Sequence, residues 1–440
     1  MRPMSPLTQR LVAISVVLLS IGIAAVLVLR SLGVPIGAGT AASPSASATA
    51  SLRPSQAASA LAEQTASPDL LDAIAQIEAQ VRQVRGLAEA DVGAPDILTR
   101  AEVTIVLEEL FAEAYPPDVV EAANASLRAL GLLAADQDIA ELTEQLYVAQ
   151  VLGFYDFEDR RMVVVSDAGF DALARITYAH EYTHALQDAA FGIGAIRDEL
   201  LEADDDVAMA QVALEEGDAS LAMILWAVQA GGMSPEELLG ISQAPLPDMT
   251  GIPGWMVRQA EFPYLAGAEF VSQLYLSGGW DAVDAAYAAP PASTEQVLHP
   301  EKYLAEEEPR VVQLPDLAAA LSADRGGDWR EAEQTTLGEA LIAIWLDEIG
   351  LDVADGDAAA AGWAGDRLSV ASGPDGAWAM VFSVAWDTGA QATEFADAYQ
   401  TIVDALPFDA SLVRVSNAET LVVHASAPDV LASAIVAASP

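Results

Sequence analysis

Two histidines one helical turn apart stand beside a glutamate in the segment 178–186, which reads YAHEYTHAL. His180 and His184 share one face of a helix, because positions i and i+4 lie one above the other. Two imidazoles on one face bind Zn²⁺ and leave coordination positions open, and a neighbouring carboxylate can take a proton from water there. The spacing therefore predicts a hydrolytic zinc site, with His180 and His184 as metal ligands and Glu181 as the catalytic base.

Histidine is scarce in this chain, which favours a functional interpretation of the pair. Only four occur in 440 residues: His180, His184, His299 and His424. The residues flanking the pair are uncharged, as expected for a helix buried behind an active site. The alternative is two core histidines whose nitrogens bond to neighbouring groups without any metal. His424 lies in a predicted strand, and we interpret it as structural.

A third metal ligand is expected downstream, because catalytic zinc sites usually have three protein ligands. The predicted helix over 207–228 contains the letters ALEEGDA, in which Glu216 is the first candidate and Glu215 the second. Neighbouring helix positions differ by about 100° in direction. Only one of the two glutamates can therefore face the histidines, and the alternative for either is an exposed helix acid.

Hydrolysis of an amide also calls for a hydrogen-bond donor to the developing oxyanion. His299 is the catalytic candidate for this role because histidine is so rare here, and a structural imidazole is its alternative. Tyr264 and Tyr303 are weaker candidates. Asp188, four residues after His184, is placed to accept a hydrogen bond from a ligand imidazole, although a solvated surface acid is the alternative.

Composition excludes several classes of protein. Cysteine is absent, which excludes a disulfide framework, a cysteine-based metal site and a cysteine nucleophile. The net charge is −46 and Lys302 is the only lysine, so nucleic acid and anionic lipid headgroups are not expected as partners. A solvated acidic surface is the simplest explanation of this charge, and it indicates cationic peptide substrates only weakly.

The N-terminus predicts a membrane anchor. Residues 11–29 contain no charged side chain, and a helix of that length spans roughly 28 Å, close to the hydrocarbon thickness of a bilayer. Arg2 and Arg10 precede it, which places the N-terminus inside the cell and the rest outside. We therefore expect an uncleaved transmembrane segment within 1–32, with a cleaved signal peptide and secretion as the alternative. A flexible linker rich in Ala, Ser and Pro follows at 33–68.

Two folded units are expected after the linker. Helical periodicity dominates 69–350, interrupted by a hairpin at 150–166 that leads into the His180 helix. Over 351–440 the predicted order is strand, strand, helix, strand, strand, helix, which indicates a small α+β domain. The predicted fold class is therefore α+β: a mostly helical domain with a small sheet, then a small C-terminal α+β domain, behind an N-terminal transmembrane helix.

The HEYTH segment, followed by Glu216 and Gly217, resembles the gluzincin metallopeptidases. This resemblance implies a zincin-like catalytic domain with His180, His184 and Glu216 as zinc ligands and Glu181 as base. The separation of His184 from Glu216 exceeds that of the best-known gluzincins, so the acids of the preceding loop remain substitutes for the third ligand. Those acids are Glu202, Asp204, Asp205 and Asp206.

Several stretches more narrowly resemble an uncharacterised group of bacterial membrane-anchored zincin-like proteins. They are the segments 153–156, 180–188, 216–219, 293–303 and 362–367. The function expected from residues and resemblance together is an outward-facing, membrane-anchored zinc metallopeptidase acting on a peptide or protein. Two alternatives stay open: a non-catalytic tethered binding or scaffold protein that keeps the zincin fold, and a zinc hydrolase of a non-peptide amide or ester.

Overall fold

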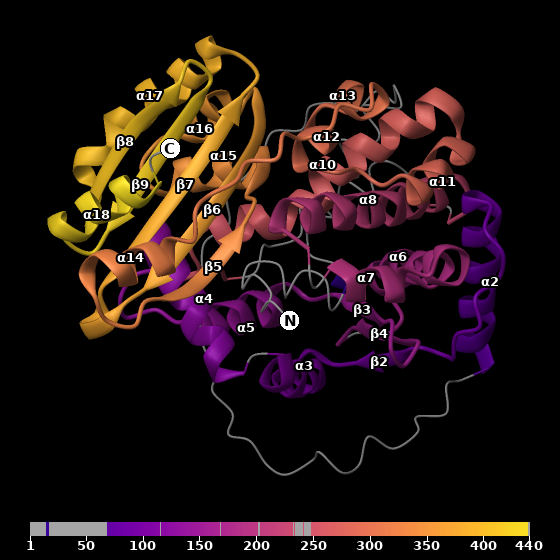
Figure 1. Ribbon diagram of the computed structural model, residues 1–440. Coiled ribbons are helices and arrows are strands. Elements are labelled where there is room, and N and C mark those ends of the chain that lie inside the picture. Colours follow the sequence, from indigo (N-terminus) through magenta and orange to yellow (C-terminus); the bar gives the residue numbers. More distant parts are fainter. Residues whose placement is uncertain are drawn as a thin grey trace.

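A computed structural model describes Ser15–Val16 and residues 68–438, with gaps at 115, 168, 201–202, 232, 234–240 and 242–247. The described chain is α+β (Figure 1), with a helical part that contains a small sheet and a C-terminal part built on a larger one. This agrees with the α+β class predicted from periodicity.

The predicted N-terminal transmembrane helix is wrong where the structure describes it. Ser15–Val16 form a short strand, β1, that pairs antiparallel with β3 (Gly153–Asp156). Backbone groups of a strand bond to a neighbouring strand, whereas a spanning helix bonds its own residues four positions apart. No helix in the described ranges is long and apolar enough to cross a membrane. The rest of the run 11–29 lies outside those ranges, as does nearly all of the linker.

The helix of the histidine pair is α6 (Ala172–Phe191), and both of its ends have clear signals. The Asp171 side chain accepts a 2.9 Å hydrogen bond from the backbone N–H of Ala174, which caps the N-terminus. Gly192 ends the helix at a φ of 73°, a left-handed conformation that glycine adopts without strain. Local sequence signals therefore determine where α6 begins and where it ends.

A small sheet lies against α6, in the strand order β1-β3-β4-β2. The predicted hairpin at 150–166 is present, since β3 pairs antiparallel with β4 (Arg161–Val165). Strand β2 (Asp96–Leu98) pairs parallel with β4. A Cβ atom on Gly153 would lie 2.7 Å from Cγ2 of Thr177, so β3 contacts α6 directly.

The centre of the helical part is α8 (Asp205–Gln229), which is buried along nearly its whole length. It lies between α6 and α10 (Gly254–Gly278) in Figure 1. A Cβ on Gly217 would lie 2.2 Å from the carbonyl oxygen of Gly267, and one on Gly267 would lie 2.1 Å from that of Ala213. The two backbones are therefore in direct contact beside residue 216, an approach that only glycine permits.

Shorter helices surround this centre. In chain order they are α2 (Pro68–Arg85), α3 (Arg100–Ala114), α4 (Pro117–Leu130), α5 (Ile139–Gln150), α7 (Ile193–Leu200), α11 (Trp280–Ala288), α12 (Thr294–Leu298) and α13 (Pro300–Leu304).

The C-terminal sheet has five antiparallel strands in the order β5-β6-β7-β9-β8. The strands are β5 (Arg330–Thr335), β6 (Trp363–Ser372), β7 (Trp378–Trp386), β8 (Asp409–Ser416) and β9 (Glu419–Ala425). The sheet thus begins before residue 351. Its helices are α14 (Leu317–Arg325), α15 (Gly338–Glu348), α16 (Val353–Ala360), α17 (Gly389–Ile402) and α18 (Pro428–Ala438).

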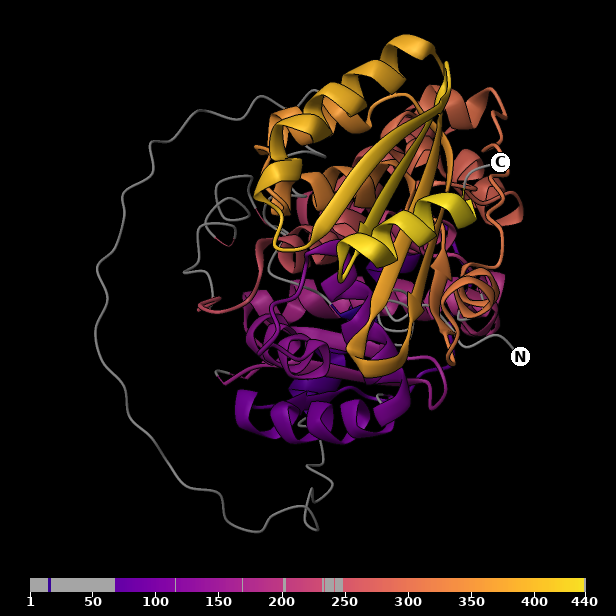
Figure 2. The ribbon, with the colours of Figure 1, turned by 60° about the vertical axis from the view of Figure 1, so that its left-hand side comes forward.

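Both faces of this sheet are covered. Along β7, Phe382 and Val384 join the core shared with α15 and α17, whereas Ala379 and Val381 pack with α14 and α18. Figure 2 shows the yellow C-terminal helix lying over one face of the long strands. Successive side chains of β7 therefore pack into two different cores, one on each face of the sheet, as expected from the two-residue period of a strand.

Candidate metal centre

Three side chains from α6 and α8 converge on one point. The Nε2 atoms of His180 and His184 lie 3.0 Å apart, and each faces Oε2 of Glu216, at 3.1 and 3.2 Å. Ligand atoms held about 2.0–2.1 Å from a tetrahedral Zn²⁺ are separated by about 3.3 Å. The observed spacing therefore fits a zinc site, and these three residues form one of two groups of metal-type ligands in the described ranges.

The tautomer of His184 follows from its neighbour Gln187. The side-chain NH₂ of Gln187 donates to the backbone oxygen of Glu215 at 3.0 Å and to Oδ2 of Asp218 at 3.1 Å. Two acceptors fix the orientation of this amide, so its oxygen must face Nδ1 of His184, 2.8 Å away. Nδ1 therefore holds a proton, and in the neutral tautomer that follows, Nε2 turns a lone pair toward Glu216.

That lone pair meets a carboxylate oxygen and a second imidazole nitrogen. Such an arrangement repels unless a proton or a cation lies between the three atoms. A metal ion resolves the repulsion directly; without one, His180 would hold its proton on Nε2 and donate it to Glu216. Burial lowers the pKa of His180, which favours its neutral, metal-binding form.

A buried network holds Gln187 in place from behind. Asp218 accepts hydrogen bonds from Arg85 Nε at 2.6 Å and from the Tyr287 hydroxyl at 2.8 Å, besides that from Gln187. Arg85 comes from α2, and its side chain is inaccessible to solvent. Contacts through Arg85, Asp218 and Gln187 thus link α2 to the imidazole of His184. The sequence offered Asp188 for this supporting role, with a surface acid as the alternative, and its Oδ1 accepts from the backbone N–H of Gly194.

The choice between the two adjacent glutamates is settled by their directions on α8. Glu215 turns to Arg197, whose Nε lies 2.9 Å from its Oε2. Glu216 turns to the two histidines, and only its other oxygen approaches Arg197, at 3.7 Å. Burial alone would raise the pKa of Glu216, but the facing histidines lower it below its ordinary value. The structure thus brings Glu216, not Glu215, to the histidine pair.

Glu181 and Tyr264 complete the surroundings of the three ligands. The Glu181 side chain is fully buried, and its Cγ lies 3.6 Å from where a Cβ on Gly153 would be. The ring of Tyr264, on α10, has its centroid 6.1 Å from that of His180. Burial raises the pKa of Tyr264 well above its ordinary value, and the charges of Glu216 and Glu181 raise it further. Its phenol therefore stays protonated.

The structure does not bring His299 to this centre. Its Nε2 lies 3.0 Å from Oε1 of Glu339 on α15, and this hydrogen bond raises the pKa of the imidazole. Tyr303 is also placed away from the centre, since its hydroxyl donates to the carbonyl oxygen of Ala289. Of the proposed oxyanion donors, Tyr264 alone lies beside a metal-ligand candidate.

The acids of the loop before α8 are also placed elsewhere. Asp204 forms an ion pair with Arg367, at 2.8 Å. Asp206 accepts from the backbone N–H of Thr294 at 2.7 Å. Asp205 begins α8, and its backbone N–H donates to Oγ1 of Thr335. Glu202 lies outside the described residues.

The candidate centre is closed to solvent. His180, Glu181 and His184 are 0% exposed and Glu216 is 2% exposed. A cavity of about 540 Å³ exists elsewhere in the described structure, but none of these four residues lines it. A substrate would therefore need a movement of neighbouring segments to reach the three ligands.

Comparison with known proteins adds little about this centre. A family profile described as a domain of unknown function (DUF8575) matches residues 326–435, the region of the C-terminal sheet. The convergent residues of α6 and α8 lie outside that match. No curated protein and no solved structure matches the chain.

Proposed function

We propose that this protein is a zinc-dependent hydrolase that cleaves peptide bonds, with His180, His184 and Glu216 as the metal ligands. The observation that supports the proposal is the convergence of two imidazole nitrogens and a carboxylate oxygen within 3.0–3.2 Å. The hydrogen bond from His184 to Gln187 supports it further, since metal-ligating histidines usually donate their second ring N–H.

Zn²⁺ in such a centre polarises a carbonyl group and lowers the pKa of water to about 7. Glu181 is the general base: its carboxylate accepts the proton of the attacking water and then passes it to the leaving amine. Tyr264 replaces His299 as the donor to the oxyanion, because its phenol lies beside His180 and stays protonated.

Burial of the centre favours one alternative function. A non-catalytic protein would use the same three ligands to hold α6 against α8 and would need no open coordination position. A zinc hydrolase acting on a non-peptide amide or ester shares the catalytic residues, and substrate screening separates it from a peptidase.

The proposal is tested by metal content. The full chain, the variants His184→Ala and Glu216→Ala, and the control His299→Ala are exchanged into zinc and dialysed, and bound metal is measured by mass spectrometry. We expect about one zinc per chain in the wild type and in the control, and none in the two ligand variants. Zinc retained by both ligand variants would contradict the assignment.

Catalysis is then tested with a peptide library at matched zinc content. Cleavage that chelation stops and zinc restores supports the hydrolase. A zinc-loaded wild-type chain that cleaves no peptide, amide or ester, but unfolds at a lower temperature after chelation, supports the scaffold function instead.

A further inference from the structure

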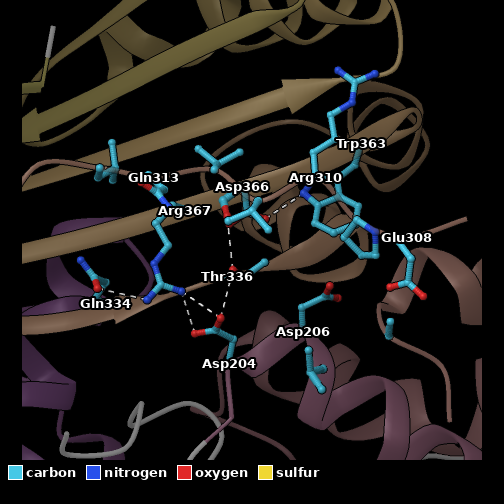
Figure 3. Close-up of a pocket in the computed structure, with 16 residues that line it drawn as sticks. Asp204, Asp206, Glu308, Arg310, Gln313, Gln334, Thr336, Trp363, Asp366 and Arg367 are labelled. Carbon is cyan, nitrogen blue, oxygen red and sulfur yellow. Dashed lines mark hydrogen bonds and ion pairs between the residues drawn. The ribbon is translucent and has the colours of Figure 1, made fainter. Parts of the chain in front are cut away.

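A second site lies where the helical part meets the C-terminal sheet. The cavity of about 540 Å³ is bounded by the N-terminus of α8, the extended segment after α13, and strands β5 and β6. Figure 3 shows the side chains that line it, coming from all of these elements. Its volume is in the range of small-ligand pockets. The segment 362–367, prominent in the sequence but with no role in the metal centre, forms one wall.

The carboxylate of Asp206 faces this cavity with one oxygen already engaged. Oδ1 accepts hydrogen bonds from the backbone N–H and the hydroxyl of Thr294, at 2.7 and 2.6 Å. Oδ2 has no hydrogen-bond donor among the described residues, although Asp206 is only 1% exposed. Burial raises the pKa of Asp206 to about 8, with Asp366 and Glu295 adding to the rise. Asp206 thus has two donors on Oδ1 but no ion-pair partner among the described residues, and a cation beside Oδ2 would favour its ionised form.

Neither arginine of the cavity wall forms an ion pair with Asp206. Arg367 donates to both oxygens of Asp204, at 2.8 and 2.9 Å, and to Gln334. The NH1 group of Arg310 donates to the backbone oxygen of Trp386, at 3.2 Å. Figure 3 shows the head of Arg310 turned away from the other labelled side chains.

One further wall residue suits a cation. Glu308 is exposed and lines the cavity, and Figure 3 places it on the same side as Asp206, below the ring of Trp363. The Trp363 side chain is 0% exposed and its Nε1 donates to Oδ2 of Asp366 at 2.8 Å, so the ring itself is not available to a ligand. Val207, Val311 and Leu314 supply apolar wall area beside these groups.

A metal ion does not fit this chemistry. The described residues hold two groups of three metal-type ligands, and neither includes Asp206. The second group, Glu295, Glu307 and Asp387, is already occupied by the ammonium of Lys302, whose Nζ lies 2.7–2.9 Å from each. A guanidinium also fits poorly, because it prefers both oxygens of a carboxylate and Asp206 offers one.

We propose that this cavity binds a primary ammonium group on a short apolar chain, of the kind a lysine side chain presents. The ammonium donates to Oδ2 of Asp206 and is attracted by Glu308, while its methylene groups contact the apolar wall. This site is independent of the metal centre and of the hydrolase proposal.

The test is calorimetric titration of the full chain with N-acetyl-lysine amide, compared with N-acetyl-norleucine amide as the uncharged probe. We expect the lysine probe to bind at least about 10-fold more tightly, the gain from a charge-assisted hydrogen bond. Asp206→Asn, which keeps an oxygen for Thr294, should weaken its binding about 10-fold or more. Glu308→Gln should weaken it about 2- to 5-fold, as for a surface ion pair. Glu394→Gln, an exposed acid on α17, should leave it unchanged.

Equal affinity for the two probes overturns the proposal. So does unchanged affinity in a folded Asp206→Asn chain, or tight binding of Ca²⁺ with none of the lysine probe. Should Asp206→Asn fail to fold, Glu308→Gln decides the matter, because an exposed rim residue does not threaten the fold and unchanged affinity there counts against the site.

Discussion

Two regions of this molecule bury histidine completely, and they use it in opposite ways. In β9, Nδ1 of His424 lies 2.8 Å from the carbonyl oxygen of Ala129 and Nε2 lies 2.7 Å from the Tyr399 hydroxyl, so each nitrogen has a complementary partner. In α6, Nε2 of His184 faces another imidazole nitrogen and a carboxylate oxygen. Burial is the same in both regions. What distinguishes a structural histidine from a ligand candidate is the chemistry facing its second nitrogen.

The largest test of this contrast is Glu181→Gln, which leaves all three ligand atoms in place. We expect zinc content to be unchanged and peptide hydrolysis to fall by about 10²–10⁴-fold, because the general base is lost. Hydrolysis rate and bound zinc are measured on the same preparation. Full activity in a zinc-loaded Glu181→Gln chain would falsify the mechanism.

His424→Gln tests the histidine that we interpret as structural. Burial lowers the pKa of His424 to about 4, against about 6.5 in an unfolded chain. Between these values the unfolded state binds the extra proton, so unfolding free energy falls as pH drops, by roughly 3 kcal/mol in all. The variant should lose that part of the acid sensitivity and keep its zinc. Urea unfolding at pH 7 and pH 4.5 measures this: an identical pH dependence in both proteins would contradict the lowered pKa, and loss of zinc in the variant would contradict a purely structural role.

Gln187→Ala tests whether the support behind the ligand matters. Loss of the acceptor for Nδ1 frees the imidazole of His184 to rotate and to change tautomer. We expect zinc affinity to fall about 10- to 100-fold. Competition with a coloured chelator gives the affinity, and Gln273→Ala, an exposed glutamine on α10, is the control. Equal zinc affinity in the two variants would show that the contact to Gln187 does not position the ring.

His299→Gln is expected to have the smallest effect. The imidazole is 36% exposed and pairs with Glu339, so unfolding free energy should fall by no more than about 1 kcal/mol. The folded pKa is raised, so this contribution exists at acidic pH and disappears as pH rises through the pKa of the folded imidazole. Thermal unfolding at pH 5 and pH 8 checks the sign. A large loss of hydrolysis would restore His299 as the oxyanion donor.

Local spacing allowed the centre to be predicted, because a helix converts a four-residue separation into a shared face. It could not choose among the downstream acids, since the direction of α8 relative to α6 depends on tertiary packing. The supporting residue was placed at Asp188 by the same spacing, but Gln187, three positions after His184, fills that role. Arg85 and Asp218 were missed because they meet only across the fold.

Sequence signals were weakest where a side chain was judged by rarity or composition alone. His299 was selected because histidine is scarce, yet scarcity does not specify position, and the imidazole pairs with Glu339. The apolar run at 11–29 suggested a spanning helix, but at Ser15–Val16 the backbone pairs as a strand with β3. The strands of the C-terminal region were predicted, but their order could not reveal that β7 has a core on each side.

The backbone contact between α8 and α10 makes two glycines, neither of them a metal ligand, necessary for the geometry of the metal centre. A methyl group at Gly217 or Gly267 has no room, so either substitution forces the helices apart and moves Glu216 from the histidines. In a saturation mutagenesis screen, these two glycines should therefore tolerate change as poorly as the histidines themselves. A search of other genomes for the same centre gains specificity by requiring both glycines, since a short histidine motif recurs by chance and a helix crossing this close does not.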